Sequence, residues 1–472
     1  MRVHNSLSCL LLMLISWVGF AETITLKEFL DLAEENHPFF SKEALAAEIE
    51  EKQAESLLGA KDWQFSVSPY YSHLGEASAA EYSIQGLDST GGEASLGGPI
   101  WATGGTLGFS FSSDYSIRDY YGTTDTSAFK QSIALSYTQP LLKNLGGKLD
   151  RLGYELSGYG INLAEVQALE NQENFMLELS TRFLDWVHLS EMVEISEERL
   201  KLAEEQLAQV QKRYKANLVD RVDVLRGEDA VRGAEQGLLQ FRAKWKARQA
   251  ELAVLVQSGE IYEKSPDFEL YALEDLPEME ESVSALKARS RLLGTFQILK
   301  SQLVHQRAGL LEQKRPELNL TLSGGLAGQD EEFVSSLEIT KPDAAVSLEF
   351  KALLGNRGIK AKIEKIDLQV KQLQEERRDL EISLEASLRN LLIQIVEMEK
   401  ILELNQAQIN SAQEKTVEEL KLYNQGRGQL TFVIQSRDNE QNAKLSYANN
   451  AALYHSLVLQ YHALLDELFP SE

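Results

Sequence analysis

The sequence predicts a mainly α fold with a small β part, built from a unit that occurs twice. Residues 149–218 and 357–424 are almost free of proline and rich in Glu, Gln, Leu, Lys and Ala, which are strong helix formers. Shorter segments before each of them alternate apolar with small or polar residues, as half-buried strands do. The order of helix, strand, loop, strand, long helix, turn and helix runs from 25 to 256 and again from 278 to 468. This order predicts a duplicated repeat of long helical hairpins and paired β-strands.

The first 21 residues precede the repeats and are typical of a signal peptide. Arg2 supplies the positive end, Leu10 to Val18 the apolar run, and Gly19-Phe20-Ala21 a small-x-small cleavage site. A membrane anchor is the alternative, but the run is shorter than the roughly 20 residues that a spanning helix needs. We therefore expect export. The single cysteine, Cys9, lies in this segment, so we expect the mature chain to contain no disulfide and no cysteine metal site.

The composition excludes some classes of partner. The chain has 72 acidic against 47 basic residues, a formal charge of -25. A surface of this sign repels a phosphate backbone, so nucleic acid is not an expected partner. Hydrophobic residues make up 43% of the chain, which predicts a folded rather than a disordered protein.

The first repeat is expected to span residues 22–259. Strands are predicted near 63–73 and 132–142, where every second residue is apolar. The glycine-containing stretch from 75 to 98 is interpreted as the loop that joins these strands. The long helical hairpin is predicted at 149–256, because a short break separates two helical runs.

The second repeat is expected to span residues 278–472, after a linker at 260–277. Its strands are predicted near 317–323 and 344–352, again from alternation of apolar and polar residues. Its long helical hairpin is predicted at 357–468. Each repeat therefore supplies two strands, and the whole chain four.

Both long helices show heptad spacing, which predicts a coiled-coil seam. At 1.5 Å rise per residue, an unbroken segment of this length forms a rod of roughly 100 Å. Apolar residues recur at alternating steps of three and four at Leu200, Ala203, Leu207, Val210 and Tyr214, and at Leu384, Leu388, Leu391, Ile395, Met398 and Leu402.

The two repeats also align with each other at the turn of each hairpin. The segment from Tyr214 to Leu225 overlays the segment from Tyr423 to Ile434 without a gap. This internal alignment supports a duplication.

Four strands are too few to close a barrel, so in a membrane they would have to be completed by strands of other chains. Strands of this length fit a membrane wall that faces lipid on one side and water on the other. An open edge in lipid leaves backbone groups unpaired, at several kcal/mol each. In a membrane, three copies would supply a 12-stranded β-barrel and gather the helices into a tube. A half-buried soluble sheet is the alternative for each strand taken alone.

A set of short motifs lies around these elements: Leu26-Lys27-Glu28-Phe29 to Asn36-His37-Pro38, Thr103-Gly104-Gly105, Gln139-Pro140-Leu141-Leu142 leading to Gly146-Gly147, Arg315-Pro316-Glu317-Leu318, and Gly355-Asn356-Arg357. Together with two tyrosine-containing helix turns in the same order, this set resembles the TolC-like outer membrane efflux family. The resemblance covers nearly the whole mature chain.

The resemblance implies a homotrimeric channel-tunnel in the bacterial outer membrane, surrounded by lipid and extending through the periplasm as an α-helical tunnel. A periplasmic adaptor (membrane fusion) protein and an inner-membrane pump would be its partners. The pump could be of the resistance-nodulation-division, ABC or major facilitator type. Drugs, ions or secreted polypeptides would leave passively through the channel, as in efflux or type I secretion, and no cofactor is implied.

In that family the two helix turns form a closed periplasmic tip, where like side chains repeat three times. Carboxylates there would favour cations. The family's acidic positions in the second repeat fall on Phe432 and Gln435, so Asp223 is the best acidic candidate, and Tyr423 could hydrogen-bond to it as a latch. The candidates for the tip or gate are Tyr214, Asp220, Asp223, Arg226, Tyr423, Arg427, Phe432 and Gln435.

Each of these candidates also has a structural interpretation. Asp220 and Asp223 could simply cap the start of a helix, where the dipole favours a carboxylate. Gly426 and Gly428 are expected to serve the turn itself, and Asn217 is an acceptable left-handed residue at the matching position of the first repeat.

No catalytic pattern is found in the sequence. The seven histidines are scattered, no carboxylate completes a metal pattern, and no nucleophile elbow or phosphate loop is present. We therefore expect no enzyme, cofactor or metal. A periplasmic adaptor or a structural coiled-coil protein of an export system is the rival hypothesis, but neither needs strands placed symmetrically in both halves.

Overall fold

The computed structural model of the chain describes residues 22–75, 84–120, 122 and 124–468. The predicted signal peptide, with Cys9, lies outside these residues. The chain divides into two compact units, each of which is built from separate stretches of sequence. Unit 1 comprises Met1–Lys42, Asn171–Ser290 and Ser383–Glu472, and unit 2 comprises Glu43–Glu170 and Arg291–Ile382.

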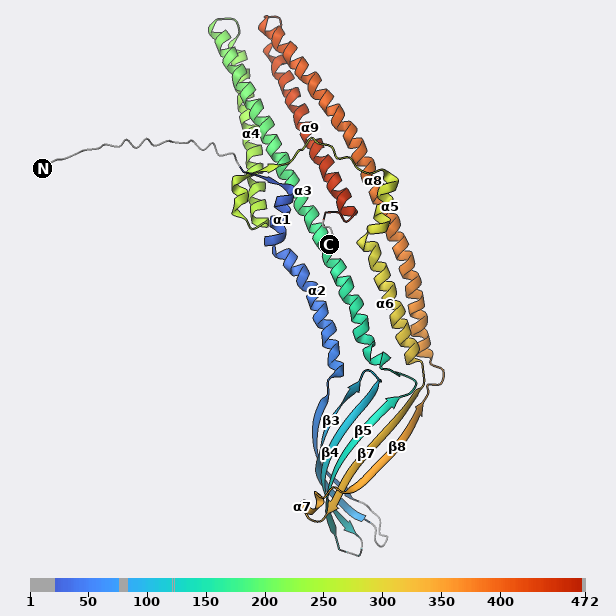
Figure 1. The fold of residues 1–472 in the computed structure, drawn as a ribbon. Coiled ribbons are helices and arrows are strands. Elements are labelled where there is room, and N and C mark those ends of the chain that lie inside the picture. The colour runs from blue at the N-terminus through green and yellow to red at the C-terminus, as the bar shows by residue number, and fades with distance from the viewer. Residues whose placement is uncertain (1–21, 76–83, 121, 123, 469–472) are drawn as a thin grey trace, which may run out of the picture. The chain divides into compact units, whose positions relative to one another are not determined.

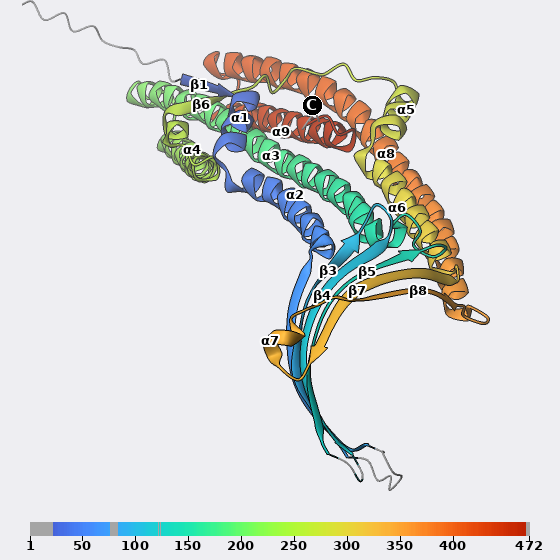
Figure 2. The same cartoon turned by 60° about the horizontal axis from the view of Figure 1, so that its bottom comes forward.

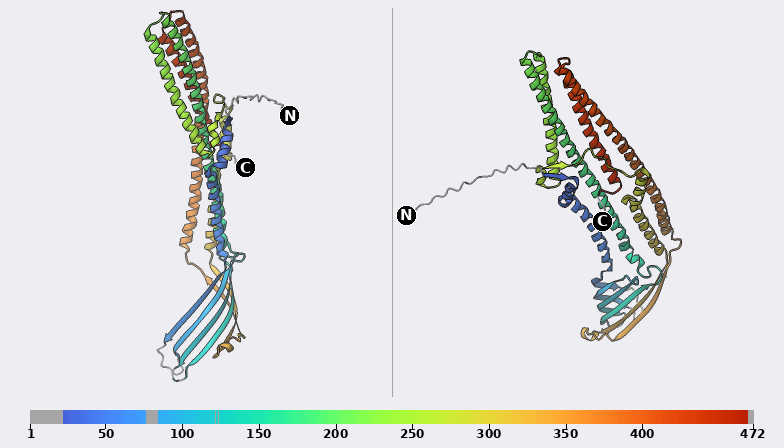
Figure 3. Two further views of the ribbon diagram at one scale, coloured as in Figure 1. Left: turned by 90° about the vertical axis from the view of Figure 1, so that its left-hand side faces the viewer. Right: turned by 45° about the horizontal axis from the view of Figure 1, so that its top comes forward.

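Two long helical hairpins contain most of the helical residues (Figure 1). Helix α3 (Lys148–Lys215) turns into α4 (Arg221–Leu255), and α8 (Arg357–Asn424) turns into α9 (Leu430–Leu464). Corresponding helices have equal lengths, 68 residues in α3 and α8 and 35 in α4 and α9. The arms of each hairpin lie side by side in every view (Figure 3). The predicted fold class, mainly α with duplicated hairpins and a smaller β part, is confirmed.

The remaining helices are shorter than the four of the hairpins. They are α1 (Leu26–Asn36), α2 (Pro38–Ser56), α5 (Met279–Arg289), α6 (Arg291–Gln313), α7 (Phe333–Ser336) and the 3-10 helices η1 (Leu57–Lys61) and η2 (Gly259–Glu263). Among all helices of the described residues, none is both long enough and apolar enough to cross a membrane.

The stretch predicted as a linker at 260–277 is partly ordered secondary structure. Strand β6 (Lys264–Asp267) pairs in parallel with β1 (Glu22–Thr25), so that Ile24 lies opposite Pro266. Ile24 is fully buried in the core of unit 1. Four residues are too few to show an alternating pattern, so this short strand was not predicted from the sequence.

An aromatic cluster lies at the centre of the core of unit 1. Helix α1 begins with a capping box, in which the Glu28 N–H donates to the Thr25 hydroxyl and the Thr25 N–H to the Glu28 carboxylate. This start places Phe29 with its ring centre 5.3 Å from that of Phe183, which in turn lies 5.8 Å from Trp186. All three rings are fully buried. Residues from the N-terminus and from α3 thus share one core.

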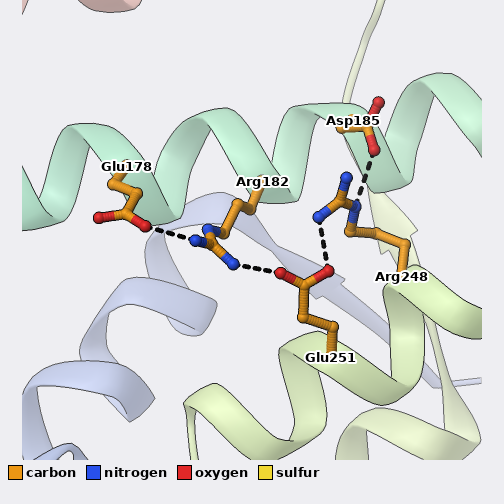
Figure 4. A network of polar contacts seen from close by, with 5 residues as sticks. All are labelled: Glu178, Arg182, Asp185, Arg248 and Glu251. Atoms are coloured by element: carbon orange, nitrogen blue, oxygen red, sulfur yellow. Dashed lines mark hydrogen bonds and ion pairs between the residues drawn. The ribbon is translucent and has the colours of Figure 1, made fainter.

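A chain of charged side chains joins the two arms of the first hairpin (Figure 4). Arg182 on α3 contacts both Glu178 and Glu251. Arg248 on α4 contacts Asp185 through Nε at 2.7 Å and the second oxygen of Glu251 at 2.6 Å. The five side chains are partly exposed, so this network aligns the helices more than it stabilises them.

A buried histidine in α9 is expected to make the stability of unit 1 dependent on pH. His455 is 8% exposed, its Nε2 lies 3.0 Å from the Leu270 carbonyl oxygen, and its ring packs edge-on against Phe268. Burial lowers the pKa of His455. The unfolded chain therefore binds a proton at a higher pH than the folded chain does. The contribution of His455 to stability is lost as the pH falls below about 6.5, down to the folded pKa.

We expect the His455→Gln variant to lose less stability than the wild-type chain between pH 7.5 and pH 5.5. The difference is at most about 1.4 kcal/mol per pH unit, because one proton is involved. Thermal unfolding followed by circular dichroism measures it. Between pH 7.5 and 8.5, where the histidine is neutral in both states, the two proteins should change in parallel. Equal slopes in the acidic range would contradict the assignment.

Unit 2 contains one antiparallel sheet in the order β2-β3-β4-β5-β7-β8. The strands lie side by side and the sheet curves along its length (Figure 2). Each strand pairs with its neighbour over nearly its whole length. The strands are β2 (Gln64–Gly75), β3 (Ile84–Ile100), β4 (Gly105–Tyr120), β5 (Thr126–Pro140), β7 (Glu317–Asp330) and β8 (Lys341–Lys351).

The sheet has six strands where the sequence predicts four. Most of strand β3 falls in the stretch interpreted as a loop at 75–98, and β4 follows it as a second unpredicted strand. The prediction of four strands per chain was wrong. The count of twelve for three copies rested on it and is not tested by the structure of one chain. The repeats therefore differ: the first supplies four strands and the second two.

Close contacts explain why β3 contains the glycines that made it resemble a loop. A Cβ at Gly91 would lie 2.6 Å from the Ser113 carbonyl oxygen on the neighbouring strand, and one at Gly98 would lie 2.9 Å from the Trp63 ring. Glycine lowers strand propensity but allows such close approach. Pairing with β4 across the full strand outweighs the local preference.

Candidate functional site

The turns of the two helical hairpins have the same backbone structure. After α3, the N–H of Leu218 donates to the Arg213 carbonyl at 2.9 Å, and after α8 the N–H of Arg427 donates to the Leu422 carbonyl at 3.0 Å. Both bonds join residues five apart, as in a Schellman motif. The repeats therefore keep their alignment through the turns.

The residue that reverses the chain has a left-handed backbone in both turns. Asn217 has φ of 57° and Gly426 has φ of 75°, which glycine and asparagine tolerate best. A Cβ at Gly428 would lie 3.0 Å from the Tyr423 nitrogen. These three residues shape the turns, as expected from the sequence.

A small apolar cluster joins the two turns at their base. Val210 from α3 and Val433 from α9 are fully buried, and Leu430 and Tyr423 are 2% and 5% exposed. The Tyr423 hydroxyl has no hydrogen-bond partner among the described residues. Tyr423 therefore acts in this chain mainly through its buried ring.

Arg213 ties the first hairpin to the second. Its guanidinium lies 4.4 Å from the centre of the Tyr423 ring. One amino group donates to the Tyr423 carbonyl at 3.1 Å and the other to the Asn424 carbonyl at 3.3 Å. These carbonyls belong to the last turn of α8, where a cation is favoured by the helix dipole. We call this set of contacts the Arg213 clamp.

The clamp was not predicted from the sequence. A basic residue in the last turn of α3 suggests only that Arg213 complements its own helix. Its contacts with α8 depend on how the two hairpins pack. No spacing within either repeat contains that information.

The predicted contact between Tyr423 and Asp223 is not present. Asp223 instead accepts a hydrogen bond from Arg226 at 3.1 Å, one turn further along α4. Asp220 occupies the N-cap position of α4, but its side chain makes no capping hydrogen bond. Within one chain the Tyr423 side chain is packed inside the cluster, and a latch between the turns of neighbouring copies stays a prediction.

The other predicted residues lie on the surface around the turns. Tyr214 is 43% and Phe432 49% exposed, and Arg427 and Gln435 are also exposed. Among the described residues, no hydrogen bond or ion pair joins them to Asp223.

A cavity of about 40 Å³, with apolar and polar residues in its wall, lies between the hairpins. Gln206 and Gln441 line it, are 4% and 1% exposed, and have amide atoms without a hydrogen-bond partner among the described residues. Arg437, which also lines it, donates to the Leu202 carbonyl, and burial lowers the pKa of Arg437. A cavity of this size can hold water. The hairpins are thus not closely packed here, and polar side chains lie beside apolar ones.

No group of three or more His, Cys, Asp or Glu suited to a metal ion is found among the described residues. The residues at the two turns offer hydrogen bonds, charge and an apolar cluster, and this arrangement holds the two helical hairpins together.

No protein-family model matches the sequence, and no curated protein matches it significantly. Solved structures do match. The outer membrane protein VceC from Vibrio cholerae is 12% identical with a TM-score of 0.64, over 93% of this chain and 96% of that chain. The Campylobacter jejuni CmeC outer membrane channel is 14% identical with a TM-score of 0.64, over 95% and 87%.

The open state of the Neisseria gonorrhoeae MtrE outer membrane channel is 14% identical with a TM-score of 0.63, over 94% of this chain and 89% of that chain. At such identities a likeness shows the fold and not the activity. The chain has the fold of these outer membrane channels, and the predicted resemblance to the TolC-like family is confirmed at the level of the fold.

Proposed function

We propose that the chain is a subunit of an outer membrane channel-tunnel. Substrates delivered by an inner-membrane transporter and a periplasmic adaptor would leave through it passively. The observation that supports this function best is the pattern of side chains on the sheet of unit 2, which matches a membrane wall.

One face of the sheet is mainly apolar; its polar side chains include Ser113 and Gln131, which lie opposite each other on β4 and β5. Exposed fractions of 70% for Phe65, 45% for Phe109 and 52% for Leu135 leave large apolar side chains open to the surroundings. A soluble sheet would cover such a face. The register places these residues in rows across the strands, one of Phe65, Leu96, Phe109 and Leu135 and the next of Val67, Ala94, Phe111, Ile133 and Leu326.

The opposite face is polar and rich in hydroxyl groups. Ser66 and Ser95 are joined at 2.7 Å between their hydroxyl oxygens, and so are Ser112 and Ser132. Lipid on the apolar side and water on the hydroxyl side are the surroundings that this alternation fits.

Aromatic residues mark both ends of the apolar face. The Trp63 ring lies over Gly98, whose row continues through Leu107 to Tyr137. Eight residues along the strands, Tyr71, Thr90, Tyr115 and Phe129 form a second row. Phe333 of α7 extends this row, 5.5 Å from Phe129 between ring centres.

The separation of the two aromatic rows fits a membrane. Eight residues at about 3.4 Å each span about 27 Å along a strand, or about 21 Å across a membrane at a tilt near 40°. Outer-membrane barrels carry an apolar band of about 25 Å between aromatic girdles. The helical hairpins, with their paired turns, would then form the periplasmic tunnel and its tip.

The direct test of this function is a measurement of ion current. The full chain is expressed in a bacterial outer membrane and purified in mild detergent. We expect a trimer by mass and small, cation-preferring single-channel currents in a planar bilayer, because the chain carries a charge of -25. Heat-denatured protein from the same preparation is the control and should not conduct. A soluble, non-conducting monomer would refute the channel and favour the periplasmic adaptor or structural coiled coil.

A further inference from the structure

We propose that β2 of one copy pairs with β8 of the next, and that three copies thereby close a barrel of 18 strands. The number follows from three copies of a six-stranded sheet. The inference rests on the proposed channel function and deepens it. Its consequence is an exit pore wider than the twelve strands predicted from the sequence would form.

The two outer strands of the sheet are open to a partner. Strands β2 and β8 stand at the ends of the strand order, and each pairs with one neighbour only. Every residue of both strands is exposed. An open edge in lipid leaves backbone groups unpaired, at several kcal/mol each. The sheet is therefore incomplete as a membrane wall without a second copy.

The direction of the strands permits closure. All five neighbouring pairs of the sheet are antiparallel, so with six strands β2 and β8 run in opposite directions. Strand β8 of the next copy is therefore antiparallel to β2 at the seam. Identical copies then form one uniformly antiparallel barrel, as bacterial outer-membrane barrels are.

The two edges also match in chemistry. On β2, Phe65 and Val67 face the apolar side, and on β8 the residues of the same face are Val346, Leu348 and Phe350. The apolar face thus continues across the seam. Proline, which lacks a backbone N–H, occurs once in each strand, at 69 and 342, so the other outward-pointing N–H groups of both edges can pair.

The hairpin of β3 and β4, the two strands beyond the four predicted from the sequence, sets the width of the proposed barrel. At equal tilt, diameter grows in proportion to strand number. With strands about 4.8 Å apart and tilted near 40°, 18 strands give a backbone diameter of about 36 Å, against about 24 Å for twelve. Barrels of 16 to 18 strands leave an aqueous channel.

The same hairpin brings charge to the polar face. Glu93 on β3 lies in the row of Ser112 and Ser132, and Asp114 on β4 lies directly opposite Lys130 on β5. A hydroxyl-lined wall with both signs of charge does not select strongly for ions of one sign. We therefore expect the selectivity of the channel to be set elsewhere, with the barrel as a wide exit.

Engineered cysteines test the seam, because the only native cysteine is Cys9. Tyr70 in the middle of β2 is replaced by cysteine and combined with a cysteine at each position from 344 to 348 of β8 in turn. The two strands lie five strands apart within one chain, so any disulfide joins two copies. Cα atoms must come within about 7 Å for a bridge. We expect covalent trimers on a denaturing gel at one or two of the five positions.

A matched control uses Ser112→Cys with the same five partners. Ser112 lies on β4, three strands from β8 within the chain and also three strands from it across the proposed seam. At about 4.8 Å per strand this is roughly 14 Å, too far for a disulfide. Cross-links from Ser112 as frequent as those from Tyr70 would reflect random collision and overturn the proposed seam.

Electron cryo-microscopy of the unmodified trimer supplies a second readout. A barrel about 36 Å wide supports the proposal, and one about 24 Å wide overturns it. A conducting trimer with the narrow barrel, or without Tyr70 cross-links, leaves the channel function standing and removes only the 18-stranded barrel. A monomer that does not conduct overturns both.

Discussion

Replacing Gly147 by alanine is expected to destabilise unit 2 by several kcal/mol and to reduce sharply the amount of folded protein. Gly147 has φ of 67°, and a Cβ there would lie 2.0 Å from the Trp101 carbonyl oxygen. That oxygen also accepts a hydrogen bond from Arg151 at 3.1 Å. The Trp101 backbone cannot move away without disturbing the β3–β4 turn and the start of α3 together.

Gly146 is a matched control for this variant. It also has a left-handed backbone, with φ of 74°, but no atom lies within 4 Å of an added Cβ. Gly146→Ala should therefore lose only the roughly 1 to 2 kcal/mol of the left-handed conformation. Denaturant unfolding followed by circular dichroism, together with membrane yield, compares the two variants. Equal losses would show that the close contact at Gly147 is not decisive.

The Arg213→Ala variant is expected to open the tip if the hairpin turns close the tunnel. It removes a charge-assisted pair of hydrogen bonds and the contact with the Tyr423 ring. A partly exposed clamp of this kind contributes about 1 to 2 kcal/mol, which corresponds to a roughly five- to thirty-fold rise in the open population. Single-channel recording of wild-type and variant trimers measures this rise.

Two control variants test whether the rise in current is specific to the Arg213 clamp. Arg226→Ala removes an arginine near the same turn, but one whose ion pair is with Asp223 of its own helix, and it should conduct like the wild type. Tyr423→Phe removes a hydroxyl that has no partner among the described residues, and it should also leave the current unchanged. A large effect of Tyr423→Phe would instead restore a role for the hydroxyl, such as a bond to a neighbouring copy.

The elements with strong local signals could be predicted from the sequence. The long helices follow from uninterrupted runs of helix-forming residues, and the turns at Asn217 and Gly426 follow from residues that tolerate a left-handed backbone. Strands β2, β5, β7 and β8 follow from alternation of apolar and polar residues. The resemblance to a family of outer membrane channels, based on short motifs, agrees with the fold.

Elements that depend on partners distant in the sequence could not be predicted. Strand β3 contains glycines that locally favour a loop, and it is a strand because β2 and β4 pair with it on both sides. Strand β6 is ordered by β1, more than 200 residues away. The burial of Tyr423, which leaves it without a bond to Asp223 inside one chain, likewise depends on packing between the two hairpins.

The sequence by itself therefore determined the fold class, the two hairpins and the positions of their turns, because periodicity and turn residues act within a few residues of each other. Only the tertiary structure decided the number of strands and the Arg213 clamp. Both depend on contacts between segments far apart in the chain. In such contacts the free energy of pairing and burial outweighs the local preference of the residues involved.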